Sequence, residues 1–120
     1  NKPFQRYARK HKISDTELSI AVSEMENGLI DADLGGNLYK KRIAKTGMGK
    51  SGGHRTLLAY VAGNRTFFMF GFEKNAKDNI TADEKRILKE MAKKYLGFDD
   101  SELSKYIDGG ALIEVTHDNV

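Results

Sequence analysis

The chain has 120 residues, a formal net charge of +3 and no cysteine. This length suits a single domain over residues 1–120 with one modest core. The lack of cysteine excludes disulfides and thiolate metal sites, which fits a cytoplasmic protein. No apolar run approaches the ~18 residues of a membrane span and no signal peptide is recognisable, so we expect no membrane partner.

Two short helices are predicted first. Residues 4–12 place apolar side chains on one helical face. The capping box Ser14-Asp15-Thr16-Glu17 then opens a second helix, which Gly28 is placed to end. Together, residues 4–27 are expected to form an antiparallel helical hairpin.

The pattern then changes to that of strands. Residues 38–45 alternate in part, residues 55–62 form an apolar run, and residues 65–73 are dense in aromatic side chains. A Gly63-Asn64 turn and a longer glycine-rich loop separate these runs, so we predict an antiparallel meander. The glycines should make residues 46–53 the most mobile internal segment.

Positive charge is concentrated on these predicted strands. Residues 34–72 contain no Asp or Glu, whereas acids are frequent elsewhere in the chain. A segment with cations only points to an anionic partner, and nucleic acid is the first candidate. Its cations are Lys40, Lys41, Arg42, Lys45, Lys50, Arg55 and Arg65.

The loop sequence AKTGMGKSGGHR, residues 44–55, contains GKS, which is the end of the P-loop pattern. A P-loop has glycine where this chain has Ala44, and its helix starts at the Lys-Ser pair. Here Gly52 and Gly53 follow instead, and glycine is a poor helix former. We therefore interpret the segment as a basic β-hairpin loop.

The rest of the chain is predicted to be mostly helical. A second capping box, Thr81-Ala82-Asp83-Glu84, opens a helix over residues 81–96. A short helix over residues 101–107 and an apolar strand over residues 111–115 follow. The predicted fold class is α+β, with an antiparallel sheet flanked by the N-terminal helical hairpin and a C-terminal helix.

This order of elements, with its basic strands, resembles the RelE/HigB superfamily of toxins from bacterial type II toxin–antitoxin systems. The resemblance is carried by LYKKRIA at residues 38–44, by G-x-G-K-x-G-G-x-R from Gly47 to Arg55, and by the strand that runs into Glu73-Lys74-Asn75. The loop is most similar to that of the HigB-like branch. Relatives open with a β-strand, so the resemblance implies that this strand is truncated or absent here.

The resemblance implies an mRNA interferase, an endoribonuclease that cuts mRNA on the ribosome without metal or cofactor. Its implied partners are mRNA, ribosomal RNA and a cognate antitoxin of the helix-turn-helix type. In the implied reaction a 2′ hydroxyl attacks the adjacent phosphate. That reaction needs a base, an acid, and cations that stabilise the charge on the phosphorane.

The candidate catalytic residues lie on the loop and its neighbouring strands. Arg55 is the expected phosphate clamp, because a guanidinium binds phosphate through two hydrogen bonds. Lys40 and Arg42 share one face of their strand by parity, and a lysine crowded by cations can act as a base. His54, a residue type that titrates near neutral pH, is a candidate for the base or for the acid, and Lys74 is the other candidate for the acid.

Five further residues are expected to contact RNA. Lys41, Lys45 and Lys50 offer charge to phosphates, and Phe70 and Phe72 can stack on bases. Several relatives carry a tyrosine or another polar group near the end of this strand. Phenylalanine cannot transfer a proton, so either another residue is the acid or cleavage is weak or lost.

Two other functions fit the sequence. A ParE-like relative of the same fold poisons gyrase and cuts no RNA, and it would not need the clustered cations at residues 40, 42, 50 and 55. A non-catalytic RNA-binding module would bind RNA with a steep dependence on salt and leave it intact.

Overall fold

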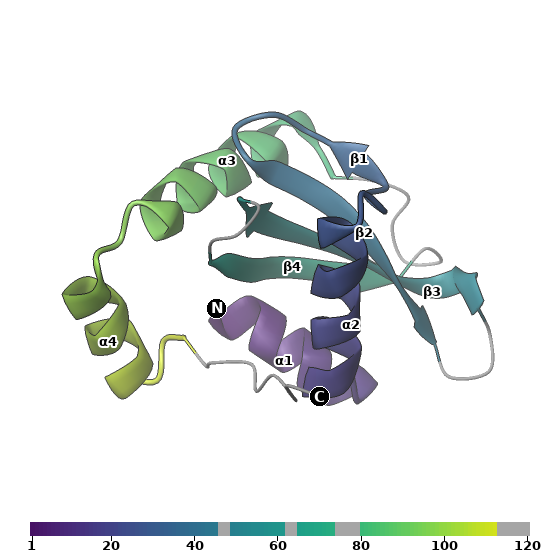
Figure 1. Ribbon diagram of the computed structural model, residues 1–120, viewed down its shortest axis with the longest axis horizontal. Coiled ribbons are helices and arrows are strands. Elements are labelled where there is room, and N and C mark those ends of the chain that lie inside the picture. Colours follow the sequence, from purple (N-terminus) through teal and green to yellow (C-terminus); the bar gives the residue numbers. More distant parts are fainter. Residues whose placement is uncertain (46–48, 62–64, 74–79, 113–120) are drawn as a thin grey trace.

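The computed structural model describes residues 1–45, 49–61, 65–73 and 80–112 of the chain, without the side chains of residues 44–45 and 49–52. The helices are α1 (Lys2–His11), α2 (Asp15–Glu26), α3 (Ala82–Leu96) and α4 (Asp100–Asp108). The strands are β1 (Ala32–Asp33), β2 (Leu38–Lys45), β3 (Gly49–Tyr60) and β4 (Thr66–Glu73) (Figure 1). The predicted α+β class and the helical hairpin are confirmed.

The four strands form one antiparallel sheet in the order β1-β2-β3-β4. The long strands β2 and β3 form its centre. Figure 1 shows that one end of this strand pair extends beyond the helices. The two-residue β1, which the sequence did not reveal, pairs with β2 through Ala32↔Lys40 and Asp33↔Tyr39.

The predicted glycine loop is shorter than expected. Lys45 pairs with Gly49, so β3 begins at Gly49 and runs through Gly52 and Gly53. The prediction of a loop over residues 46–53 is therefore wrong from residue 49 onward, because the strand pairing resumes at Gly49 beyond a register shift between Ile43 and Lys45. Residues 46–48 lie outside the described residues, and the expected mobility of the loop stays a prediction.

The predicted ends of two other strands also differ. β3 ends at Tyr60, two residues before the end of the predicted strand 55–62. Ala111 and Leu112 are not in a strand, and the remainder of the predicted strand 111–115 lies outside the described residues. Within the ranges that the structure describes, no helix is long and apolar enough to cross a membrane.

The helices begin where their capping boxes predict. Ser14 and Glu17 exchange hydrogen bonds at the start of α2, and Thr81 and Glu84 do the same at α3. Asp99 caps α4 in the same way with Glu102. Each such cap contributes about 1 kcal/mol to stability. Arg65 then ties α4 to the sheet, because its guanidinium pairs with Asp100 and donates to the Phe98 carbonyl.

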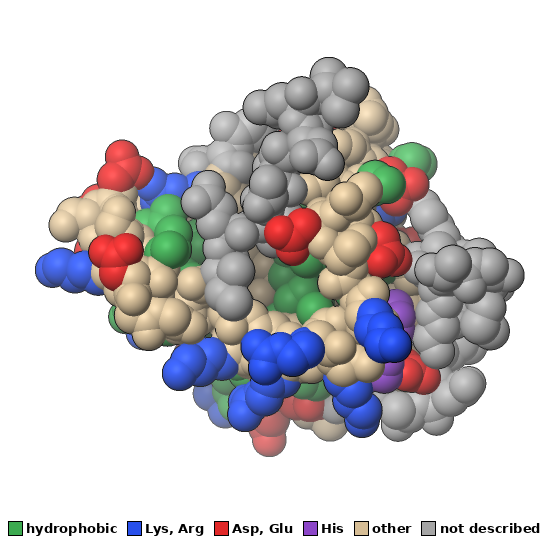
Figure 2. All heavy atoms as spheres, turned by 90° about the horizontal axis from the view of Figure 1, so that it is seen from below, with side chains coloured by type: hydrophobic (Ala, Val, Ile, Leu, Met, Phe, Trp, Pro, Cys, Tyr) green, Lys and Arg blue, Asp and Glu red, His purple; other side chains and the backbone are tan. Residues whose placement is uncertain are grey.

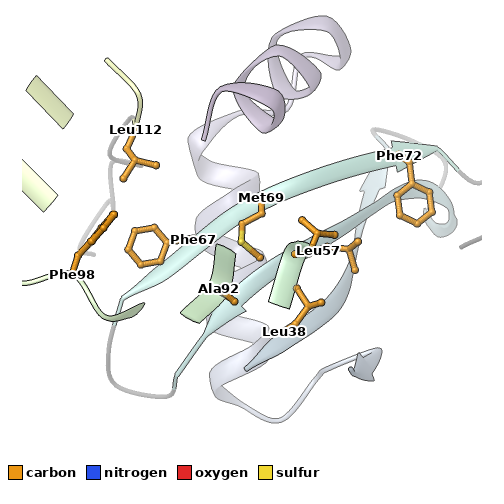
Figure 3. Packing of buried hydrophobic residues seen from close by; sticks show 10 residues of the cluster. Leu38, Leu57, Phe67, Met69, Phe72, Ala92, Phe98 and Leu112 are labelled. Carbon is orange, nitrogen blue, oxygen red and sulfur yellow. The ribbon is translucent and has the colours of Figure 1, made fainter. Parts of the chain in front are cut away.

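Two hydrophobic clusters pack on opposite faces of the sheet. One joins Leu38 and Leu57 to Leu88 and Ala92 of α3, and it extends toward α4 (Figure 3). The other joins Leu58 to side chains of α1 and α2. Leu57 and Leu58 thus point to different clusters, as successive residues of a strand must. The sheet has an α3 face and an α1/α2 face.

Gly71 lets α1 lie close against β4. A Cβ atom at this position would stand 2.5 Å from Cδ1 and 2.8 Å from Cε1 of Tyr7. Both atoms belong to the ring itself, so a side chain here would push the whole Tyr7 ring away from the sheet. Glycine at this position therefore sets where Tyr7 lies.

We expect Gly71→Ala to lower the free energy of unfolding by about 1–3 kcal/mol, because it overpacks the contact with Tyr7. Urea denaturation measures this change. In a Tyr7→Ala background the same substitution should cost almost nothing, since the crowded ring is gone. An equal loss in both backgrounds would contradict the assigned cause.

Candidate functional site

Two arginines face each other on β2 and β3, the two central strands of the sheet. In the register of β2 and β3, Arg42 is paired directly with Arg55. Residues paired in this way point to the same face, and their Cβ atoms lie about 5 Å apart. Lys40, two residues along β2, shares that face. Like charges directly opposite each other destabilise a sheet, so this arrangement costs the fold stability.

These cations lie on the α3 face, beyond the residues that α3 covers. Leu38 and Leu57 are fully buried against α3, whereas Lys40, Arg42 and Arg55 are half-buried. The exposed fraction of the Arg42 side chain is 42%, so an anion in solvent can reach it.

One carboxylate offsets part of this charge. Asp31 Oδ1 lies 3.9 Å from Nε of Arg42, and Asp31 Oδ2 accepts a 2.6 Å hydrogen bond from the Arg42 backbone N–H. Nε of Arg42 is buried and has no hydrogen-bond partner in the described part of the chain. Among the described residues no ion pair involves Arg55. Sequence analysis missed Asp31, because its role depends on the unrecognised β1 turn that brings it to β2.

The two phenylalanines of the predicted RNA surface lie beside the arginines. Phe72 pairs with Arg55 and Phe70 with Leu57, so both belong to the α3 face. Figure 3 shows Phe72 at the far end of the sheet, apart from the other labelled residues. The exposed fraction of Phe72 is only 5%, and its ring centroid lies 5.9 Å from that of Phe70. The rings therefore form an apolar floor next to Arg55, with Phe70 the more exposed of the two.

Lys41 points to the α1/α2 face. Its side chain is 2% exposed, and Nζ lies 3.1 Å from Oε1 of Glu24 and donates a 2.9 Å hydrogen bond to the Leu29 carbonyl. This ammonium ties β2 to α2 and to the chain that follows it. A contact between Lys41 and RNA would first have to break that ion pair.

His54 also lies on the α1/α2 face, on the other side of the sheet from Arg55. It is 4% exposed, and its Nδ1 shares a 2.7 Å hydrogen bond with the hydroxyl of Tyr7. Its strand partner is Glu73. Sequence reasoning grouped His54 with Arg55 because they are neighbours in the chain, but neighbours in a strand face opposite ways.

Three predicted site residues remain, namely Lys45, Lys50 and Lys74. The backbones of Lys45 and Lys50 lie near the closed end of the β2–β3 hairpin, and their side chains are outside the described structure. Lys74 follows β4 directly and lies outside the described residues. Their assigned roles stay predictions.

We expect Lys41→Met to lower the free energy of unfolding by about 1–3 kcal/mol, because it removes a buried ammonium together with its ion pair to Glu24 and its hydrogen bond to the Leu29 carbonyl. The range allows for solvent screening of Glu24, whose side chain is 27% exposed. Thermal or urea unfolding measures the loss. Lys40→Met, on the neighbouring residue of the other face, is the matched control and should change stability by about 0.5 kcal/mol or less. Equal losses would show that Lys41 has no special structural role.

In a comparison with protein families, the chain matches the family model described as the RelE toxin of the RelE/RelB toxin–antitoxin system. The match covers residues 1–115. A comparison with curated proteins finds no match.

Proposed function

This chain belongs to the RelE toxin family of RelE/RelB toxin–antitoxin systems, and from that premise we propose that it is an endoribonuclease that cuts mRNA on the ribosome. Toxins of this family generally cleave mRNA and are paired with an antitoxin. Ribosome dependence, a helix-turn-helix antitoxin, membership of the HigB-like branch and action in the cytoplasm are the finer parts of the proposal. The G-x-G-K-x-G-G-x-R loop supports the branch.

The opposed pair of Arg42 and Arg55 carries the proposal. A phosphate between them would accept hydrogen bonds from both guanidinium groups and cancel their repulsion. During the attack of a 2′ hydroxyl, negative charge builds on the phosphorane, so fixed cations stabilise the transition state more than the bound substrate. The repulsion between the two arginines destabilises the free protein, and a bound anion would relieve it. The pair would therefore favour binding of a phosphate.

The proposed reaction forms a bond from the 2′ oxygen to phosphorus and breaks the bond from phosphorus to the 5′ oxygen. The products are a 2′,3′-cyclic phosphate and a free 5′ hydroxyl. A base takes the proton of the 2′ hydroxyl, and an acid gives one to the 5′ oxygen. Lys40, on the same face as the arginines, is the proposed base, and Lys74 is the proposed acid.

His54 is left out of the proposed reaction site. It lies under α1 on the other face of the sheet, so its ring cannot reach a phosphate held by Arg42 and Arg55. Phe70 is proposed to stack on a base at the edge of the site, while Lys45 and Lys50 contact ribosomal RNA from the closed end of the hairpin. Lys41 remains in its ion pair.

We expect Arg55→Ala to slow mRNA cleavage by about 10²–10³-fold, because it removes a donor to charge that develops in the transition state. Arg42→Ala should have a somewhat smaller effect. The measurement is the rate of mRNA cleavage by purified toxin on translating ribosomes, with mapping of the cut sites within codons. Both variants should keep or exceed wild-type stability, because each removes one of two opposed cations.

The matched control is Arg86→Ala, which removes an arginine from the exposed surface of α3, where it pairs only loosely with Glu90. Cleavage by this variant should stay within about twofold of wild type, since surface charges that touch no substrate have small effects. If Arg86→Ala and Arg55→Ala slow cleavage equally, the site assignment is lost.

The two alternative functions are outcomes of the same experiment. A wild-type protein that arrests growth, leaves mRNA intact and inhibits gyrase would be a ParE-like toxin. A protein that binds ribosomes or RNA with a steep dependence on salt, but neither cleaves RNA nor arrests growth, would be a binding module. Either result would overturn the proposed reaction.

A further inference from the structure

Three potential metal ligands meet where the end of α1 crosses the sheet. His11 is the last residue of α1, His54 lies on β3, and Glu73 is the last residue of β4. One ligand atom from each lies within 4.8 Å of the other two. Among the described residues, this is the group in which at least three potential ligand side chains lie close enough together to hold one metal ion.

The three side chains are already in mutual contact. Nδ1 of His11 lies 2.9 Å from Oε1 of Glu73, and the His11 and His54 ring centroids are 5.1 Å apart. The side chains of His11 and Glu73 are 18% and 28% exposed, so the cluster opens to solvent on one side. Figure 2, which views the molecule from this side, shows histidine side chains in purple at the surface.

We propose that His11, His54 and Glu73 bind one divalent transition-metal ion of the zinc class. Two imidazole nitrogens and one carboxylate oxygen are a ligand set that zinc accepts, with water in the fourth position. Ligand atoms around tetrahedral zinc lie about 3.3 Å apart. The three ligand atoms now lie within 4.8 Å of one another, and rotations of the partly exposed His11 and Glu73 side chains would bring them to that spacing.

Tyr7 is the positioning residue of this site. A metal-bound histidine usually uses its second ring nitrogen in a hydrogen bond that fixes the ring, and the 2.7 Å bond between His54 Nδ1 and the Tyr7 hydroxyl has that form. Gly71 makes this possible, because any side chain there would displace the Tyr7 ring.

The site is separate from the proposed cleavage site. It lies on the α1/α2 face, whereas Arg42 and Arg55 belong to the α3 face. Bound metal would join α1 to β3 and β4, which are far from it in the chain, and so stabilise the packing of the N-terminal helix. Its role is structural, and the inference stands or falls independently of RNA cleavage.

The test uses the full chain without a histidine tag, stripped of metal with a chelator. Zinc titration followed by calorimetry should show one ion per chain, and zinc should raise the melting temperature in a saturable way. Cobalt(II) as a probe should give the visible d–d bands of a tetrahedral nitrogen–oxygen site. Tyr7→Phe should weaken zinc binding about tenfold, as the loss of an outer hydrogen bond does.

The decisive variants are His11→Gln and Glu73→Gln, since His54 is almost completely buried and its replacement also disturbs the core. Each should weaken zinc binding more than Tyr7→Phe does and remove the cobalt bands. His117→Gln is the matched control, because it removes the one other histidine of the sequence, and it should bind zinc like wild type. The proposal is overturned if wild type binds no zinc, if both variants bind it unchanged, or if His117→Gln abolishes binding.

Discussion

The register between β2 and β3 is the constraint on which the rest of the structure depends. It pairs Arg42 with Arg55 and Ile43 with His54, so it decides which side chains meet on each face. A slip of one residue would move every side chain of a strand to the other face. Arg55 would then lie under α1, and the proposed phosphate site and both hydrophobic clusters would be lost together.

The two faces of the sheet have different tasks. On the α1/α2 face, polar side chains make internal contacts: Lys41 pairs with Glu24, and His54 bonds to Tyr7. On the α3 face, Arg42 and Arg55 repel one another, and among the described residues only Asp31 partly compensates the charge of Arg42. The first face contributes to stability, while the second gives up stability to hold a fixed positive site. This division explains how consecutive residues, such as Arg55 and His54, come to lie in unrelated surroundings on opposite faces.

Local sequence signals predicted most of the elements. The capping boxes at Ser14 and Thr81 located two helices, and strand parity correctly separated Lys40 and Arg42 from Lys41. The extension of β3 back to Gly49 could not be predicted, because it depends on the pairing of Lys45 with Gly49 beyond a register shift, and glycine itself has a low strand propensity. The pairing of Arg42 with Arg55 could not be predicted either, because it depends on the register between β2 and β3. The cluster of His11, His54 and Glu73 brings together three segments that are far apart in the chain. Local sequence patterns do not predict such contacts.

The central claim is that Arg42 and Arg55 act on one phosphate. A double-mutant cycle of Arg42→Ala and Arg55→Ala, read as the rate of mRNA cleavage on translating ribosomes, tests it most directly. If both guanidinium groups hold the same phosphate, the double variant should lose much less activity than the product of the two single losses. Losses that simply multiply would mean that the two arginines act independently, and the account of a shared site would be contradicted.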